Sequence, residues 1–112
     1  MNTTKITSFA NDKIKYVIKL RDKRQRDKDR KFTIEGYREI SRAIGSGRIP
    51  FRSLFIAPEW FQGPPDWGLL ERLDCPIYEL SRELFEKISY RDRPDGFLAL
   101  ADTPDFHFGY PA

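Results

Sequence analysis

The amino-acid sequence predicts an α/β fold, a three-layer α/β/α sandwich with a small mixed sheet. Runs of apolar and β-branched residues with strand character alternate with stretches of helical periodicity. A crossover helix is the economical way to join parallel strands, so this alternation favours a parallel or mixed sheet with helices on both faces. The length of 112 residues fits one domain with a single core.

The first expected element is a helix that begins near Asp12. Ile14 and Val17 recur at helical spacing, and the side chain of Asn11 can accept a hydrogen bond from the free amides of the first turn. The run 21–31 that follows contains no apolar residue, so we expect an exposed loop there.

The rest of the chain repeats the pattern of strand and helix. A strand at 32–34 ends at Gly36, and the helix that follows ends at the run 45–47, which contains two glycines. The later expected elements are a strand at 54–57, a helix at about 66–73, a strand at 77–80, a helix capped by Ser81, and a final strand at 96–101.

Charge is unevenly distributed along the chain. Residues 1–42 contain 13 Lys and Arg against 6 Asp and Glu, whereas residues 43–112 contain 7 against 11. Clustered cations are typical of a nucleic-acid-binding surface, because they release counterions from the phosphate backbone. A solvated helix with internal salt bridges is the alternative, since Asp22, Asp27 and Asp29 are interleaved with the cations.

The sequence lacks the residues that several common kinds of site require. His107 is the only histidine and Cys75 the only cysteine, so a His-based triad, an internal disulfide and a zinc site are excluded within this chain. The glycines match neither a dinucleotide-binding nor a phosphate-binding loop. No run approaches the ~18 apolar residues of a membrane span. We expect a cytoplasmic chain that avoids the membrane, with no catalytic, cofactor or metal residues of its own.

Two motifs carry a family resemblance. One is Phe32-Thr33-Ile34-Glu35-Gly36, and the other is Pro94-Asp95-Gly96-Phe97-Leu98-Ala99-Leu100; Ile6-Thr7-Ser8, Asn11, Lys15, Leu20, Arg26, Arg38 and Ala43 add to the match. In this order, over about residues 5–101, the sequence resembles the N-terminal substrate-binding domain of the SpoU/TrmH family of RNA ribose 2′-O-methyltransferases. Many relatives place Ser and Gln around the late proline, where this chain has Arg93 and Asp95.

The resemblance implies a fold, a cofactor and partners. The fold would be similar to that of kink-turn-binding ribosomal proteins. Residues 1–101 would form an RNA substrate-binding domain, and residues 102–112 a linker toward a C-terminal SPOUT catalytic domain absent from this chain. That second domain would form a homodimer, bind S-adenosylmethionine and methylate a ribose 2′-hydroxyl of rRNA or tRNA. Residues 1–112 alone are expected to bind RNA and leave it unmodified.

The basic residues are the expected contacts to RNA. An arginine can hold a phosphate bidentately or stack on an unpaired base. Phe32, Tyr37 and Tyr90 are candidates for stacking on bases where they are exposed, although we favour core packing for Phe32. For Glu35 we favour a structural role, in which its carboxylate caps amides or pairs with an arginine. The predicted RNA-binding residues are Lys15, Lys19, Arg21, Lys23, Arg24, Arg26, Arg30 and Arg38.

A protein-interaction module is the alternative function. The acidic C-terminal half and an aromatic tail with Phe106, Phe108 and Tyr110 would then dock on the catalytic domain or on a partner subunit. A stand-alone kink-turn binder is less favoured, because the chain does not match the glycine and asparagine signature with which those ribosomal proteins contact RNA.

Overall fold

The structure is a computed structural model that describes residues 2–104. The strands are β1 (Thr4–Lys5), β2 (Lys31–Glu35), β3 (Phe51–Ile56), β4 (Ile77–Glu79) and β5 (Phe97–Asp102). The helices are α1 (Asp12–Lys19), α2 (Lys23–Asp29), α3 (Tyr37–Ser46), α4 (Trp67–Glu71) and α5 (Arg82–Ile88), and a 3-10 turn, η1 (Pro58–Trp60), follows β3.

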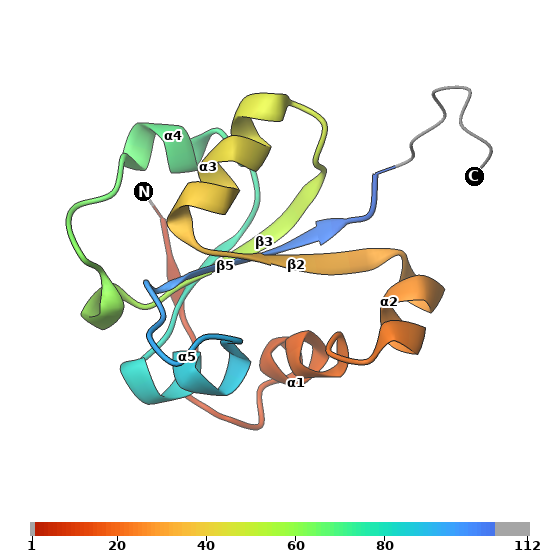
Figure 1. Cartoon of the computed structure of the whole chain (residues 1–112). Helices are drawn as coiled ribbons and strands as arrows, with labels where there is room; N and C mark the ends of the chain where they lie inside the picture. Colours follow the sequence, from red (N-terminus) through yellow and green to blue (C-terminus); the bar gives the residue numbers. More distant parts are fainter. Residues whose placement is uncertain (1, 105–112) are drawn as a thin grey trace.

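The five strands form one mixed sheet in the spatial order β1-β4-β3-β5-β2 (Figure 1). β1, β4 and β3 are parallel neighbours, whereas β5 runs antiparallel to both β3 and β2. β5 is buried along most of its length between these two neighbours. The expected mixed sheet is confirmed.

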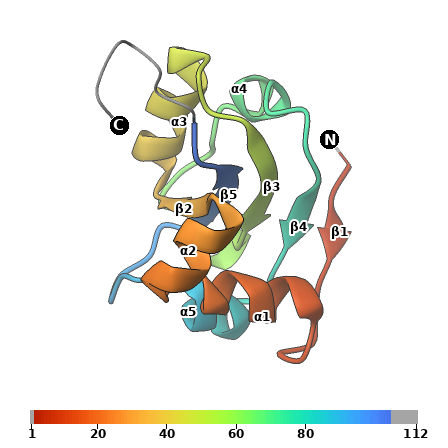
Figure 2. The ribbon, with the colours of Figure 1, turned by 90° about the vertical axis from the view of Figure 1, so that its right-hand side faces the viewer.

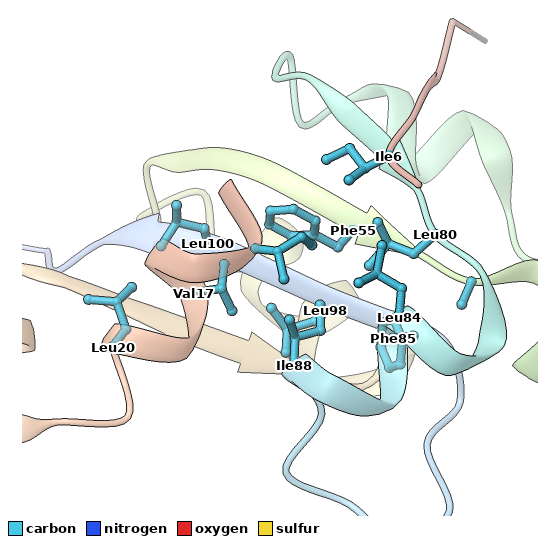
Figure 3. Close-up of a cluster of buried hydrophobic side chains, with 12 residues drawn as sticks. Ile6, Val17, Leu20, Phe55, Leu80, Leu84, Phe85, Ile88, Leu98 and Leu100 are labelled. Carbon is cyan, nitrogen blue, oxygen red and sulfur yellow. The ribbon is translucent and has the colours of Figure 1, made fainter. Parts of the chain in front are cut away.

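Helices cover both faces of this sheet (Figure 2). Side chains of α1 and α5 converge on one face, where Phe55, Leu98 and Leu100 receive them (Figure 3). The other face packs against α3 and α4, through a second cluster that includes Leu54 and Ile56. Successive residues of β3 therefore enter different clusters, as the pleat of a strand requires. The predicted three-layer arrangement is confirmed.

Local side-chain signals determine several helix ends. The side chain of Asn11 accepts a hydrogen bond from the amide of Lys13 at 2.8 Å, and that of Ser81 from the amide of Leu84 at 3.1 Å. Both residues are the expected N-caps. α3 ends at Gly47, which takes a left-handed conformation with φ of 67°.

The structure corrects the prediction of a loop at 21–31, because residues 23–29 form the helix α2. It also adds β1, which the sequence pattern did not predict. β1 has two exposed residues, paired with Tyr78 and Glu79 of β4, and so it carries no apolar alternation to detect. The helix predicted at about 66–73 is shorter, ending at Glu71.

Two further observations concern the single thiol and the lengths of the helices. Cys75 is half-buried, and burial, with a smaller contribution from Asp74, raises the pKa of its thiol to about 11. The thiol is therefore protonated at neutral pH and a weak nucleophile. Within residues 2–104, every helix is too short or too polar to cross a lipid bilayer.

Candidate nucleic-acid interface

α2 is a helix of which no residue is buried. Asp22 caps its first turn by accepting a hydrogen bond from the amide of Arg24 at 2.9 Å. Lys23 pairs with Asp27 one turn later at 2.7 Å, a spacing that supports isolated helices. Arg30 ends the helix in a left-handed conformation, with φ of 52°. Capping and charge pairing therefore form this helix without an apolar stripe.

Hydrogen bonds, rather than apolar packing, hold α2 against α1. The hydroxyl of Tyr16 on α1 donates to the carboxylate of Asp29 at 2.5 Å, and the amide of Gln25 donates to the same oxygen at 2.7 Å. These two bonds lower the pKa of Asp29. Burial and the bond to Asp29 raise the pKa of Tyr16 to about 12. The Asp29 carboxylate thus stays ionised at neutral pH and serves as the shared acceptor.

Two of the predicted RNA-binding arginines make structural hydrogen bonds. Arg26 donates to the carbonyls of Leu20 and Arg21, both at 2.8 Å, and so satisfies free acceptors after α1. Arg21 donates to the carbonyls of Lys87 at 2.7 Å and Ser89 at 3.3 Å, at the end of α5. Arg26 therefore links α2 to the end of α1, and Arg21 links residues 12–30, which we call the α1–α2 segment, to the end of α5.

Other cations of α1 and α2 are free to bind anions. Their side chains are exposed and make no hydrogen bond, ion pair or ring contact within residues 2–104. Lys13 of α1 is excluded, because its ammonium lies 5.4 Å from the ring centroid of Tyr78. We call the free cations the basic tract: Lys15, Lys19, Arg24, Lys28 and Arg30. Four of these five were predicted, and Lys28 was missed. Another predicted residue, Lys23, uses its ammonium in the ion pair with Asp27. Arg38 is exposed in the first turn of α3 and lies outside the tract.

The two motifs that carried the resemblance meet at the turn from β2 to α3. The amide of Gly36 donates to the carbonyl of Phe97 at 2.9 Å. The amide of Tyr37 donates to the carboxylate of Asp95 at 2.8 Å, so Asp95 caps α3 where Gly36 offers no side chain. Gly36 has φ of 106°, a conformation that favours glycine.

Glu35 binds the loop that connects α5 to β5. Its carboxylate accepts hydrogen bonds from the hydroxyl of Ser89 at 2.5 Å and from the amide of Tyr90 at 2.8 Å. The side chain of Arg91 donates to the backbone carbonyl of Glu35 at 2.9 Å. The expected capping role of Glu35 is confirmed. We call this set of contacts, around Glu35, Gly36 and residues 89–96, the β2–α3 junction.

The aromatic candidates differ in exposure. Tyr37 packs on Phe97, with ring centroids 5.1 Å apart, and its hydroxyl accepts from the amide of Asp66, so its role is structural. Phe32 is partly buried in β2. Tyr90 is 52% exposed, and so is available for stacking. Phe9, 51% exposed, was missed, because a single aromatic in an irregular segment leaves no periodic signal.

Comparison with known proteins identifies the domain. Residues 11–99 match the family model for the MRM3-like substrate binding domain. The chain belongs to this family. No curated protein sequence matched it.

Solved structures similar to this MRM3-like domain come from RNA methyltransferases. An RNA 2′-O ribose methyltransferase shares 34% identity over 94% of this chain and 40% of its own, with a TM-score of 0.79. An rRNA methyltransferase from Sinorhizobium meliloti (18% identity, 91% and 38% covered, TM-score 0.69) shares the fold. The SpoU methyltransferase AviRb from Streptomyces viridochromogenes, in complex with AdoMet, also shares the fold. Its identity is 19% over 88% of this chain and 38% of its own, with a TM-score of 0.70. The chain spans about two fifths of the length of these proteins. The expected SpoU/TrmH relationship is confirmed.

A hollow of about 530 Å³ between η1 and α4 is lined by Phe61, Trp67, Glu71 and Glu79, among others. Within residues 2–104, its lining combines two aromatic rings with two carboxylates and contains no lysine or arginine.

Proposed function

We propose that residues 1–101 form the RNA substrate-recognition domain of an S-adenosylmethionine-dependent RNA ribose 2′-O-methyltransferase that acts on rRNA or tRNA in the cytoplasm. The basic tract is the observation that carries this proposal. Its five cations belong to two adjoining helices and their ends, and they carry no internal partner in the described chain. Such charges favour RNA binding, because neutralising phosphates releases the counterions condensed on the RNA.

The contacts beneath the tract prepare it for RNA. Tyr16, through Asp29, and Arg26, through the carbonyl of Leu20, hold α2 against α1 before any ligand arrives. A surface with a fixed backbone loses less conformational entropy when it binds. Phosphate contacts position an RNA without reading its sequence, so the tract supplies affinity and orientation.

The proposal extends to the whole protein. Residues 102–112 would act as a linker to a C-terminal SPOUT catalytic domain, which would bind S-adenosylmethionine and form a homodimer. The greater length of the similar methyltransferases supports this arrangement, and one of them was solved with AdoMet. Residues 1–112 would then bind RNA and leave it unmethylated.

RNA affinity measured across a salt series tests the proposed interface. Lys15→Gln, Lys19→Gln and Arg24→Gln should each weaken binding and reduce the slope of log K against log salt by roughly 0.7 to 0.9 for every phosphate that the protein no longer neutralises. Arg72→Gln is the matched control, because Arg72 is an exposed arginine at the end of α4 on the other face of the sheet. Slopes equal to wild type in all three tract variants would remove the tract from the interface.

The alternative, a protein-interaction module, is favoured by the hollow between η1 and α4. Its walls combine Phe61 and Trp67 with Glu71 and Glu79, a setting that suits an arginine or lysine of another protein surface. The hollow lies across the sheet from α1. The aromatic tail predicted for this module, Phe106, Phe108 and Tyr110, lies outside the described residues. Trp67→Ala should weaken docking on the rest of the protein if this module exists, with RNA affinity unchanged.

A further inference from the structure

We infer that Phe9 and Tyr90 form a stacking site for unpaired RNA bases next to the basic tract. This inference rests on the proposed RNA-binding function and adds the place where bases bind and the class of RNA, single-stranded nucleotides. We call Phe9, Tyr90 and the two cations beside them, Arg21 and Lys87, the aromatic site.

The two rings are available to a ligand. Phe9 is 51% exposed and Tyr90 is 52% exposed, and neither ring packs on another aromatic ring within residues 2–104. Burying either ring under a base would remove apolar surface from water. Every base has a π-face, so an exposed ring binds unpaired nucleotides with little sequence preference.

A cation accompanies each ring. The ammonium of Lys87 lies 5.9 Å from the ring centroid of Phe9, and the guanidinium of Arg21 lies 5.4 Å from that of Tyr90. A base stacked on the exposed part of a ring carries its phosphate beside it, within reach of a neighbouring cation. This pairing of ring and cation favours a polyanion over an apolar partner.

The aromatic site is continuous with the basic tract. Arg21 belongs to the connection between α1 and α2, and its guanidinium donates to the carbonyl of Lys87 at 2.7 Å. The same group lies over Tyr90, so Arg21 joins the two cation-bearing helices to both halves of the aromatic site. A strand of RNA that follows the tract past Arg21 reaches the exposed rings.

Hydrogen bonds fix the backbone beneath both rings. The amide of Tyr90 donates to Glu35 at 2.8 Å, and Ser89 donates its hydroxyl to the same carboxylate. Before Phe9, the carbonyl and hydroxyl of Ser8 accept bonds from the amides of Asn11 and Ala10, which closes a turn. Rings presented on ordered backbone lose less entropy when a base stacks on them.

Binding of two RNA probes by the 112-residue chain tests the inference. The probes are a short single-stranded oligoribonucleotide carrying one 2-aminopurine and a blunt duplex of the same sequence. Phe9→Ala and Tyr90→Ala should each weaken single-strand binding by roughly 5- to 100-fold, and change duplex binding much less. Tyr90→Phe should retain both the affinity and the quenching of 2-aminopurine fluorescence, because it keeps the ring. Trp67→Ala is the control for an exposed aromatic elsewhere, being 39% exposed on α4.

The outcomes separate this inference from the proposed function. If wild type binds RNA through the tract but both alanine variants bind the single strand as wild type does, the aromatic site is overturned and the RNA-binding function stands. An equal loss in Trp67→Ala also overturns the site, as does a loss in Tyr90→Phe. If wild type binds neither probe, the proposed function fails and the inference with it. Unchanged thermal melting of the variants confirms that they are folded.

Discussion

The α1–α2 segment and the β2–α3 junction lie at opposite ends of β2 and use their charged residues differently (Figure 1). At the junction, Glu35, Arg91 and Asp95 all bond to other groups of the chain. In the α1–α2 segment, internal bonds hold the helices while the cations of the basic tract bond to none of residues 2–104. One region uses its charges to hold the fold, and the other leaves several for a ligand.

This difference separates stability from binding. A charge with good internal hydrogen bonds stabilises the folded state, whereas an exposed charge without a partner contributes little. Substitutions at the junction should therefore lower the free energy of unfolding. Substitutions in the basic tract should lower RNA affinity and leave the free energy of unfolding nearly unchanged.

The largest expected effect is that of Gly96→Ala at the junction. Gly96 has φ of +86°, and an added Cβ would lie 2.5 Å from the carbonyl oxygen of Ala57 and 3.0 Å from the ring of Phe61. Strain and overpacking together should lower the free energy of unfolding by about 3 kcal/mol, measured by urea denaturation.

Gly45→Ala provides the matched control for that substitution. Gly45 lies within α3, and no atom lies within 4 Å of a Cβ added there. Because alanine has a higher helix propensity than glycine, the free energy of unfolding of this variant should rise by about 0.5 to 1 kcal/mol. If the two variants have the same free energy of unfolding, the inference that the junction has no room for a side chain at Gly96 is wrong.

The next effect is expected from Glu35→Ala. This change leaves the amide of Tyr90 and the hydroxyl of Ser89 without their acceptor. Hydrogen bonds to a charged group are worth about 1.5 to 3 kcal/mol, so the free energy of unfolding should fall by about 2 kcal/mol. Glu86→Ala on the exposed face of α5 should stay within about 0.5 kcal/mol of wild type in the same urea titration. A double-mutant cycle with Ser89→Ala that shows no coupling would refute the contact.

Much of the junction and the core could be predicted from sequence. Several local sequence signals are confirmed by the structure. They are the strand-forming residues from Phe32 to Gly36, the apolar runs that form β3 and β5, and the N-caps Asn11 and Ser81. The meeting of Gly36 with Phe97 could not come from periodicity, because it joins residues far apart in the chain. The family resemblance supplied both motifs, but not the contact between them.

The α1–α2 segment was harder to predict. Absence of apolar residues indicated a loop, yet Asp22 as a cap and ion pairing of Lys23 with Asp27 form a helix. These capping and i,i+4 signals were present in the sequence and outweigh the missing stripe. The sequence could not show which cations lack an internal hydrogen bond. Arg24 and Arg26 are the same residue type in the same helix, and only the folded structure brings a backbone carbonyl next to Arg26.

Asp102→Asn tests the charge pairing at the end of β2 where the α1–α2 segment lies. The bonds from Arg52 and Lys31 lower the pKa of Asp102 to about 2. Because the pKa of Asp102 is lower in the folded chain, its ion pairs stabilise the fold at any pH above the ordinary carboxyl pKa of about 3.9. That stabilisation is lost as the pH falls through about 2. The variant should lose about 1 kcal/mol at neutral pH, allowing for partial exposure of the pair. The difference from wild type in urea titrations should disappear in the acid range, and a difference independent of pH would exclude the ion pairs as its cause.

The smallest effects come from two arginines of α2 and sharpen the comparison within one helix. Arg26→Gln removes two bonds to the end of α1, so the free energy of unfolding should fall by about 0.5 to 1 kcal/mol. Arg24→Gln removes no internal bond of its side chain and should stay within about 0.5 kcal/mol of wild type. RNA binding should reverse this order, because Arg24 offers its whole guanidinium to phosphate while Arg26 already uses one nitrogen for two carbonyls. Urea denaturation and a salt series on the same two proteins check both orders. If Arg26→Gln changes the salt slope as much as Arg24→Gln, internal bonding does not keep an arginine of this segment from RNA.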